Sequence, residues 1–146
     1  MFYPQRQVNR LEFVMMLLAA LEQPPIPCVN TGLEGDSFLP VWARPYVCAA
    51  IQQGIITENT FEWDTVPTRA EAVLLTHRAA GITDVKRYNL DVFDLEEIPQ
   101  WALSSYITLG AYQMLDFYDG AAHPHAALTR ERAADLIWQL YKLKNG

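Results

Sequence analysis

The residues of this sequence best suited to chemistry are three arginines that recur in nearly the same six-letter context. The contexts are VNRLEF at residues 8–13, PTRAEA at 67–72 and LTRERA at 128–133. A guanidinium carries several N–H donors in one plane, which suits it to bind a carboxylate through two parallel hydrogen bonds. The repeated motif therefore indicates three positions at which an anion, or an acidic side chain, could be held.

Helix capping explains the residues around each arginine. In a capping box, a Ser, Thr or Asn side chain accepts a hydrogen bond from the backbone three residues later, and a Glu there bonds back to the cap. Loss of such a cap costs about 1 kcal/mol. The sequence offers the pair as Asn9 with Glu12 and as Thr68 with Glu71, and Thr129 can still cap although Arg132 replaces the glutamate.

Capping does not explain the arginines themselves. Arg10, Arg69 and Arg130 fall at the first helical position, where the helix dipole disfavours a cation by a few tenths of a kcal/mol. A local rule broken at the same place three times indicates a second role. One alternative is a buried salt bridge, for example to Asp36 or Asp94. The other is an external anion, held by the guanidinium together with exposed N–H groups of the helix start.

The motif belongs to an internal repeat of about 60 residues. The three arginines are 59 and 61 residues apart, and Trp42 and Trp101 are 59 apart, each with Pro two residues before it and Ala after it. Two markers with one period indicate repeated supersecondary units. We therefore predict one all-α domain over residues 1–146, with a partial unit at 1–33 and full units at 34–81 and 92–146.

Each full unit is predicted to hold two helices, so we expect five main helices with little or no sheet. Pro40 and Pro99 suit the first turn of the tryptophan helices. Gly54 ends the first of these helices, and Gln113 stands in its place in the second. The two tryptophans are most simply core anchors, with stacking on a sugar as the alternative. The apolar segment 13–21 follows two arginines as in a signal peptide, but it lacks a cleavage site and is predicted to be a core helix too short to span a bilayer.

Composition excludes several classes of function. The chain has 146 residues, 51% of them hydrophobic, and a formal net charge of −6. An acidic protein lacks the basic stripe of a nucleic-acid binder. The two cysteines, Cys28 and Cys48, are too few for a zinc site, and either a disulfide or two free thiols is compatible with the sequence.

Nothing in the sequence predicts catalysis or a cofactor. No serine or cysteine has a base and an orienting acid at a recognisable spacing, and the glycines form no phosphate loop. Asp119, His123 and His125 share one segment, which we interpret as a solvated loop and not as a metal site. We expect His77 to be a packed or surface histidine, and Glu96–Glu97 to be a solvated helix start. We predict a protein that is not an enzyme and uses no cofactor or metal.

The sequence resembles the S-layer homology (SLH) repeat over nearly its whole length. The matching letters of the middle unit are Asp36, Trp42-Ala43, Gly54-Ile55-Ile56, Phe61 and Thr68-Arg69-Ala70-Glu71, and the last unit offers Phe93-Asp94, Trp101-Ala102 and Thr129-Arg130.

The resemblance implies a pseudo-threefold helical domain in which the three motif helices lie close together. It implies non-covalent anchoring to a secondary cell-wall polysaccharide, often one with a pyruvate ketal on an amino sugar, at the outer surface of a bacterium. We expect the export signal, and a larger surface protein that the domain anchors, to lie outside these residues. The alternative is a protein-interaction module that keeps the SLH scaffold without polymer binding; neither reading involves nucleic acid or membrane insertion.

The motif arginine is the family's carboxylate contact, in grooves between adjacent repeats. The candidate ligand-binding residues are Arg10, Arg69, Arg130, Glu71, Trp42, Trp101 and Gly54. The sequence departs from the family where a second glycine usually follows Gly-Ile-Ile. Glu58 and Asp116 lie there, and we expect these acids to repel a carboxylate near the grooves. The first unit also lacks a leading Trp-Ala helix.

Overall fold

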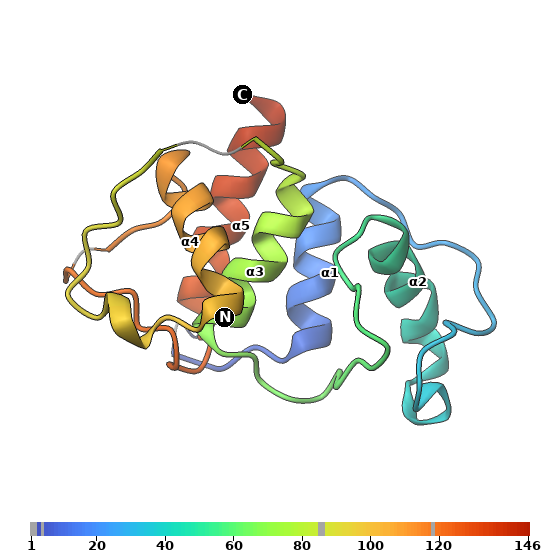
Figure 1. The fold of residues 1–146 in the computed structure, drawn as a ribbon. Helices are drawn as coiled ribbons and strands as arrows, with labels where there is room; N and C mark the ends of the chain where they lie inside the picture. Colours follow the sequence, from blue (N-terminus) through green and yellow to red (C-terminus); the bar gives the residue numbers. More distant parts are fainter. Residues whose placement is uncertain (1–2, 4, 85–86, 118) are drawn as a thin grey trace.

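The computed structural model describes residues 3, 5–84, 87–117 and 119–146, and its regular secondary structure is helical, with long loops between the helices (Figure 1). Within these residues three isolated β-bridges occur but no strand. The all-α prediction and the five expected helices are therefore confirmed. The helices are α1 (Arg10–Ala20), α2 (Arg44–Gln52), α3 (Arg69–Ala80), α4 (Gln100–Ala111) and α5 (Arg130–Asn145), with three short 3₁₀ helices, η1 (Asp36–Phe38), η2 (Val41–Ala43) and η3 (Leu95–Glu97).

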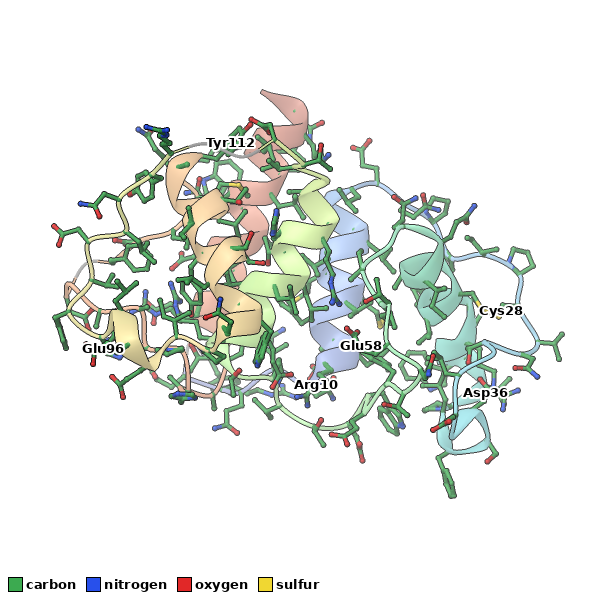
Figure 2. The ribbon with its side chains drawn as sticks, viewed as in Figure 1. Arg10, Cys28, Asp36, Glu58, Glu96 and Tyr112 are labelled. Carbon is green, nitrogen blue, oxygen red and sulfur yellow. A yellow bond between two sulfur atoms is a disulfide. The ribbon has the colours of Figure 1, made fainter. Side chains whose placement is uncertain are left out.

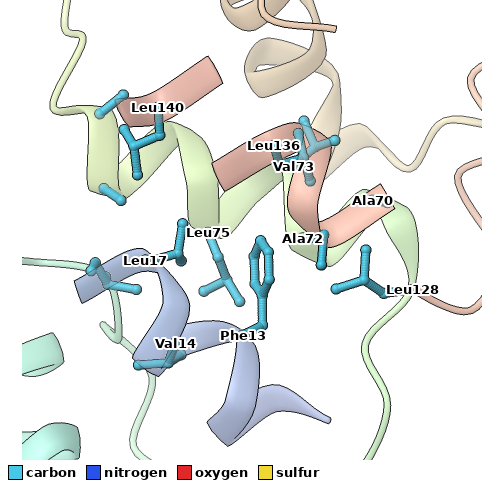
Figure 3. Packing of buried hydrophobic residues seen from close by; sticks show 14 of the residues in the cluster. Phe13, Val14, Leu17, Ala70, Ala72, Val73, Leu75, Leu128, Leu136 and Leu140 are labelled. Atoms are coloured by element: carbon cyan, nitrogen blue, oxygen red, sulfur yellow. The ribbon is translucent and has the colours of Figure 1, made fainter. Parts of the chain in front are cut away.

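The three motif helices form the centre of the molecule. α1, α3 and α5 each contact the other two, while α2 packs on α1 and α4 packs on α3 (Figure 1). Side chains from the three central helices meet in the core, among them Phe13 and Leu17 of α1, Val73 of α3, and Leu136 and Leu140 of α5 (Figure 3). Burial of this apolar surface, at about 25 cal/mol per Å², is the main force that holds the helices together.

The starts of the motif helices are tied together in a ring by backbone hydrogen bonds. The N–H of Arg10 donates to the carbonyl of Thr65 at 2.8 Å, just before α3, and the N–H of Arg69 donates to Ala126 at 2.8 Å, just before α5. The N–H of Arg130 donates to Arg6 at 2.7 Å, just before α1, which closes the ring. We expected exposed N–H groups at these helix starts. For the first N–H of each helix this expectation is wrong, because a carbonyl in the segment before another motif helix accepts its hydrogen bond.

The tryptophans are not core anchors, and that prediction is wrong. Trp42 is 60% exposed and Trp101 is 54% exposed, whereas the alanines that follow them, Ala43 and Ala102, are fully buried. The small side chain lets these helix starts approach the centre closely, and the neighbouring ring is then directed to solvent. In the Trp-Ala motif the alanine, and not the tryptophan, is therefore the residue that packs in the core.

The ends of the tryptophan helices match the prediction. Gly54 adopts a left-handed backbone with φ of 77°, and Gln113 adopts the same conformation with φ of 59° although it carries a side chain. The prolines lie one position earlier than predicted: Pro40 caps the 3₁₀ turn that leads into α2, and Pro99 is the N-cap residue of α4.

A disulfide joins Cys28 to Cys48 of α2, which selects the first of the two alternatives for the cysteines (Figure 2). It fixes the long segment between α1 and α2 on the outer side of α2. Among the described residues, the helices are too short or too polar to cross a membrane, and the segment 13–21 forms most of α1 in the core.

Candidate functional site

Three seams between the central helices each combine a motif arginine with the third residue of the next motif helix. The α1/α3 seam brings together Arg10 and Glu71, and the α3/α5 seam brings together Arg69 and Arg132. The α5/α1 seam has Arg130 and Glu12 along one cavity. The same position is thus acidic in two seams and basic in one.

In the α1/α3 seam the arginine is satisfied inside the protein. The Arg10 guanidinium forms an ion pair with Glu71 and donates to the hydroxyl of Thr65. Below it, Arg78 donates to both carboxylate oxygens of Glu58, at 2.8 and 3.1 Å, and these hydrogen bonds lower the pKa of Glu58. The surrounding cavity measures about 230 Å³. A ligand anion would have to displace Glu71.

The salt-bridge alternative therefore holds for Arg10, but the predicted partners were wrong. Asp36 accepts from the hydroxyl of Thr31 and lies 3.8 Å from Arg44, both of them near it in the sequence. Asp94 accepts the backbone N–H groups of Ala122 and His123, at 2.8 and 2.9 Å. These acids hold loops together, so they cannot reach the motif arginines.

In the α3/α5 seam the arginine is buried and has no partner among the residues that the structure describes. Arg69 is 7% exposed, and its guanidinium forms no hydrogen bond or ion pair with any of the described residues. It lines a cavity of about 760 Å³ and a second one of about 310 Å³, both shared with Arg132 and Asp135. Burial lowers the pKa of Arg69. The same burial raises the pKa of Tyr106 to about 12, against the effect of the Arg69 charge.

The acids around this larger cavity are more exposed than the arginine. Asp116, Asp119 and Asp135 are all exposed. Asp119 bonds to the ring of His123, and this hydrogen bond lowers the pKa of its carboxyl. Exposed charges are screened by water, while a desolvated cation acts at a lower effective dielectric constant. The strongest local attraction for an anion is therefore at Arg69.

The α5/α1 seam resembles the first seam in composition. Arg130 and Glu12 line a cavity of about 330 Å³. Glu12 completes a capping box by accepting the N–H of Asn9 at 3.1 Å, while its own N–H donates to the Asn9 side chain at 2.8 Å. The acid at the third position is thus engaged with its own helix.

The structure does not bring the seven predicted ligand residues into one site. Arg10 and Glu71 lie together, and Arg69 and Arg130 occupy separate seams. The other three, Trp42, Trp101 and Gly54, line none of these cavities. Glu58 and Asp116 do line the α1/α3 and α3/α5 seams as expected. In the sequence, Arg132 was interpreted only as a missing cap residue. Its position was the signal that Arg69 has no acidic partner among the described residues.

The remaining polar clusters offer little chemistry. No group of His, Cys, Asp and Glu within the described residues could hold a metal ion. His77 is bound between Ser105 at 2.9 Å and the carbonyl of Ile82 at 3.0 Å. Neither the models of known protein families nor the curated protein sequences give a match to this chain.

Proposed function

We propose that this protein binds a carboxylate-bearing saccharide of a cell-wall polymer in the α3/α5 seam, and thereby anchors itself or a larger protein to the cell surface. The observation that carries the proposal is Arg69, a buried guanidinium that has no hydrogen-bond or ion-pair partner among the described residues and lines a cavity of about 760 Å³. A buried ionised group is costly unless it is paired. A ligand carboxylate would supply the missing partner.

The proposal includes an SLH-type, pseudo-threefold arrangement of the units. The cyclic hydrogen bonds from Arg10, Arg69 and Arg130 support it, since each helix start is capped by the segment before the next one. The mutual contacts of α1, α3 and α5 also support it. The resemblance in sequence and the ring of backbone contacts are independent observations.

The three seams differ in what they could bind. In the α1/α3 seam Glu71 occupies the place of a ligand carboxylate. In the α3/α5 seam the equivalent residue is Arg132, which adds a second guanidinium to the cavity wall. We therefore assign one working groove to this chain, around Arg69.

The disulfide supports a location outside the cytosol. Disulfides persist in oxidising compartments and are rare in reducing ones. The Cys28–Cys48 bond is therefore in keeping with a protein at the cell surface.

The test is co-sedimentation with cell walls from the organism that makes the protein, before and after the secondary polymer is stripped. We expect the protein to sediment only with intact walls, and Arg69→Ala to abolish sedimentation. Arg10→Ala is the matched control, because it removes the same residue of the motif from a seam that is closed internally. Sedimentation that Arg69→Ala leaves unchanged would refute the assignment.

A second candidate is a protein-interaction module on the same scaffold, without polymer binding. The internal pair of Arg10 with Glu71 favours it, because this seam has replaced an external anion by a side chain. A folded protein that ignores polymer-bearing walls would favour this second function.

A further inference from the structure

The α5/α1 face carries a group of exposed apolar side chains, independent of the Arg69 cavity. Trp138 is 56% exposed and Tyr141 is 43% exposed, and their rings stack with centroids 5.9 Å apart. With Ala134 and Ile137 of α5 and Met16, Ala19 and Ala20 of α1, they line an open hollow of about 540 Å³. We call these seven residues the α5/α1 face.

The equivalent positions on the other two motif helices are better covered. Counted from the motif arginine, Ala134, Ile137, Trp138 and Tyr141 correspond to Val14, Leu17, Leu18 and Leu21 of α1, and to Val73, Thr76, His77 and Ala80 of α3. In those two helices each of these residues is buried or half-buried. Only on α5 are the last two of the four positions exposed.

A further helix packs on each of the other two motif helices. α2 packs on α1, and α4 packs on α3. His77, the counterpart of Trp138, contacts Ser105 of α4 at 2.9 Å. The loop after α2 also reaches the next motif helix, because Arg78 of α3 donates to the carbonyl of Ile55 at 3.1 Å. On two of the three motif helices, therefore, the element that packs on the outside is an α-helix.

The side chains of the face indicate which kind of helix fits. α1 presents leucines, and the helix that covers it buries small residues, Ala43, Val47 and Ala50, at spacings of four and three. α3 presents smaller residues, and its partner α4 buries the larger Tyr106 and Leu109. Since α5 presents Ile137, Trp138 and Tyr141, large side chains, it matches a helix with small residues.

We propose that the α5/α1 face binds an amphipathic α-helix of another polypeptide, with small apolar residues at positions i, i+4 and i+7. The partner helix would lie on α5 as α2 lies on α1. It would cover the exposed rings of Trp138 and Tyr141. A contiguous exposed apolar patch of this kind is typical of an interaction site. Recognition is by packing of a helix into a groove, with anchors at helical spacing.

The probe is a fluorescein-labelled peptide with residues 40–56 of this chain and Cys48 replaced by alanine, titrated with the full protein by fluorescence anisotropy. We expect saturable binding that Trp138→Glu weakens about tenfold or more, as for an aromatic anchor at an interface. Trp101→Glu is the control and should leave binding unchanged, because Trp101 is equally exposed, at 54%, but lies on α4. A peptide with glutamate at 43 and 50 should not bind.

Light scattering at the same concentrations tests the competing occupant. A monomer that binds the peptide supports the proposal. A dimer that Trp138→Glu dissociates would overturn it, because a second copy would then cover the face. Absence of saturable peptide binding up to about 1 mM, the range of very weak complexes, would also overturn it. So would an affinity that Trp138→Glu and Trp101→Glu change equally.

Discussion

Arg132→Glu should convert the α3/α5 seam into a copy of the α1/α3 seam. In the first seam the third residue of α3, Glu71, pairs with Arg10. Arg132 occupies the same position of α5, after the same threonine cap, and lines the cavity of Arg69. The substituted glutamate would therefore meet a buried guanidinium that has no partner among the described residues.

The expected change in stability follows from the burial of Arg69. A hydrogen bond to a charged group contributes about 1.5–3 kcal/mol, and a buried charge left unpaired costs a similar amount. Since Arg132 makes contacts of its own that would be lost, we expect a net gain of about 1–2 kcal/mol in the free energy of unfolding. For a chain of this size that corresponds to about 2–8 °C in Tm.

Urea denaturation followed by circular dichroism measures the change in stability, and co-sedimentation with polymer-bearing walls measures the change in wall binding. Arg132→Glu should be more stable than the parent and should lose wall binding at least about tenfold, because the glutamate occupies the site of the ligand carboxylate. Glu71→Gln is the matched variant in the other seam: it keeps the size of the side chain, loses the charge opposite Arg10, and should reduce stability by about 1 kcal/mol.

A lower stability of Arg132→Glu together with persistent wall binding would refute this assignment of the seam. Arg69 would then be satisfied in another way, and the seam would not hold an anion. A rise in stability with unchanged wall binding would support the ion pair between the new glutamate and Arg69. It would also show that the ligand does not bind in this groove.

Three further outcomes can be measured on the same protein. Reduction of the Cys28–Cys48 disulfide, which spans a sequence separation of 20, should lower the free energy of unfolding by about 3 kcal/mol, measured by urea denaturation with and without a reductant. The pKa of Glu58 is lowered below 4.5 by Arg78, so this carboxylate stabilises the fold above the unfolded pKa and the effect is lost as pH falls through the folded one. The Tm difference between the parent and Arg78→Ala should therefore shrink between pH 7 and pH 3, and a constant difference would contradict this origin. Gln113→Gly should raise stability by up to about 1 kcal/mol, because φ at this residue is 59° and glycine adopts that conformation without a steric cost; a lower Tm would show that the glutamine side chain contributes more than the backbone strain costs.

Local patterns in the sequence sufficed for the helices and their caps. Asn9, Thr68 and Thr129 are the N-cap residues, and each motif arginine is the first helical residue. The period of the repeat also placed Gly54 and Gln113 at equivalent backbone positions. These features depend on residues within one turn of each other, so a single sequence is enough to specify them.

Packing between units was not accessible in the same way. The partner of Arg10 is 61 residues away, and it is a glutamate to which capping had already assigned a role. The tryptophans had the composition of a core, but the adjacent alanines Ala43 and Ala102 are the buried residues. Which of two neighbours faces inward depends on how closely two helices approach, and a repeat period does not contain that distance.

The residue at the third position of each motif helix sets the charge of its seam. A glutamate at this position has two competing hydrogen-bond partners. Glu12 bonds back to the N–H of Asn9 and completes its own capping box. Glu71 accepts the Arg10 guanidinium instead, and the hydrogen bond from the Thr68 side chain reaches it only at 3.5 Å. Where the third residue is Arg132, Thr129 still caps the helix through the N–H of Arg132 at 3.3 Å. The fold therefore tolerates either charge at this position, at the cost of half a capping box. Under the proposed function, one substitution at this position decides whether a seam binds an external anion or is closed by an internal carboxylate.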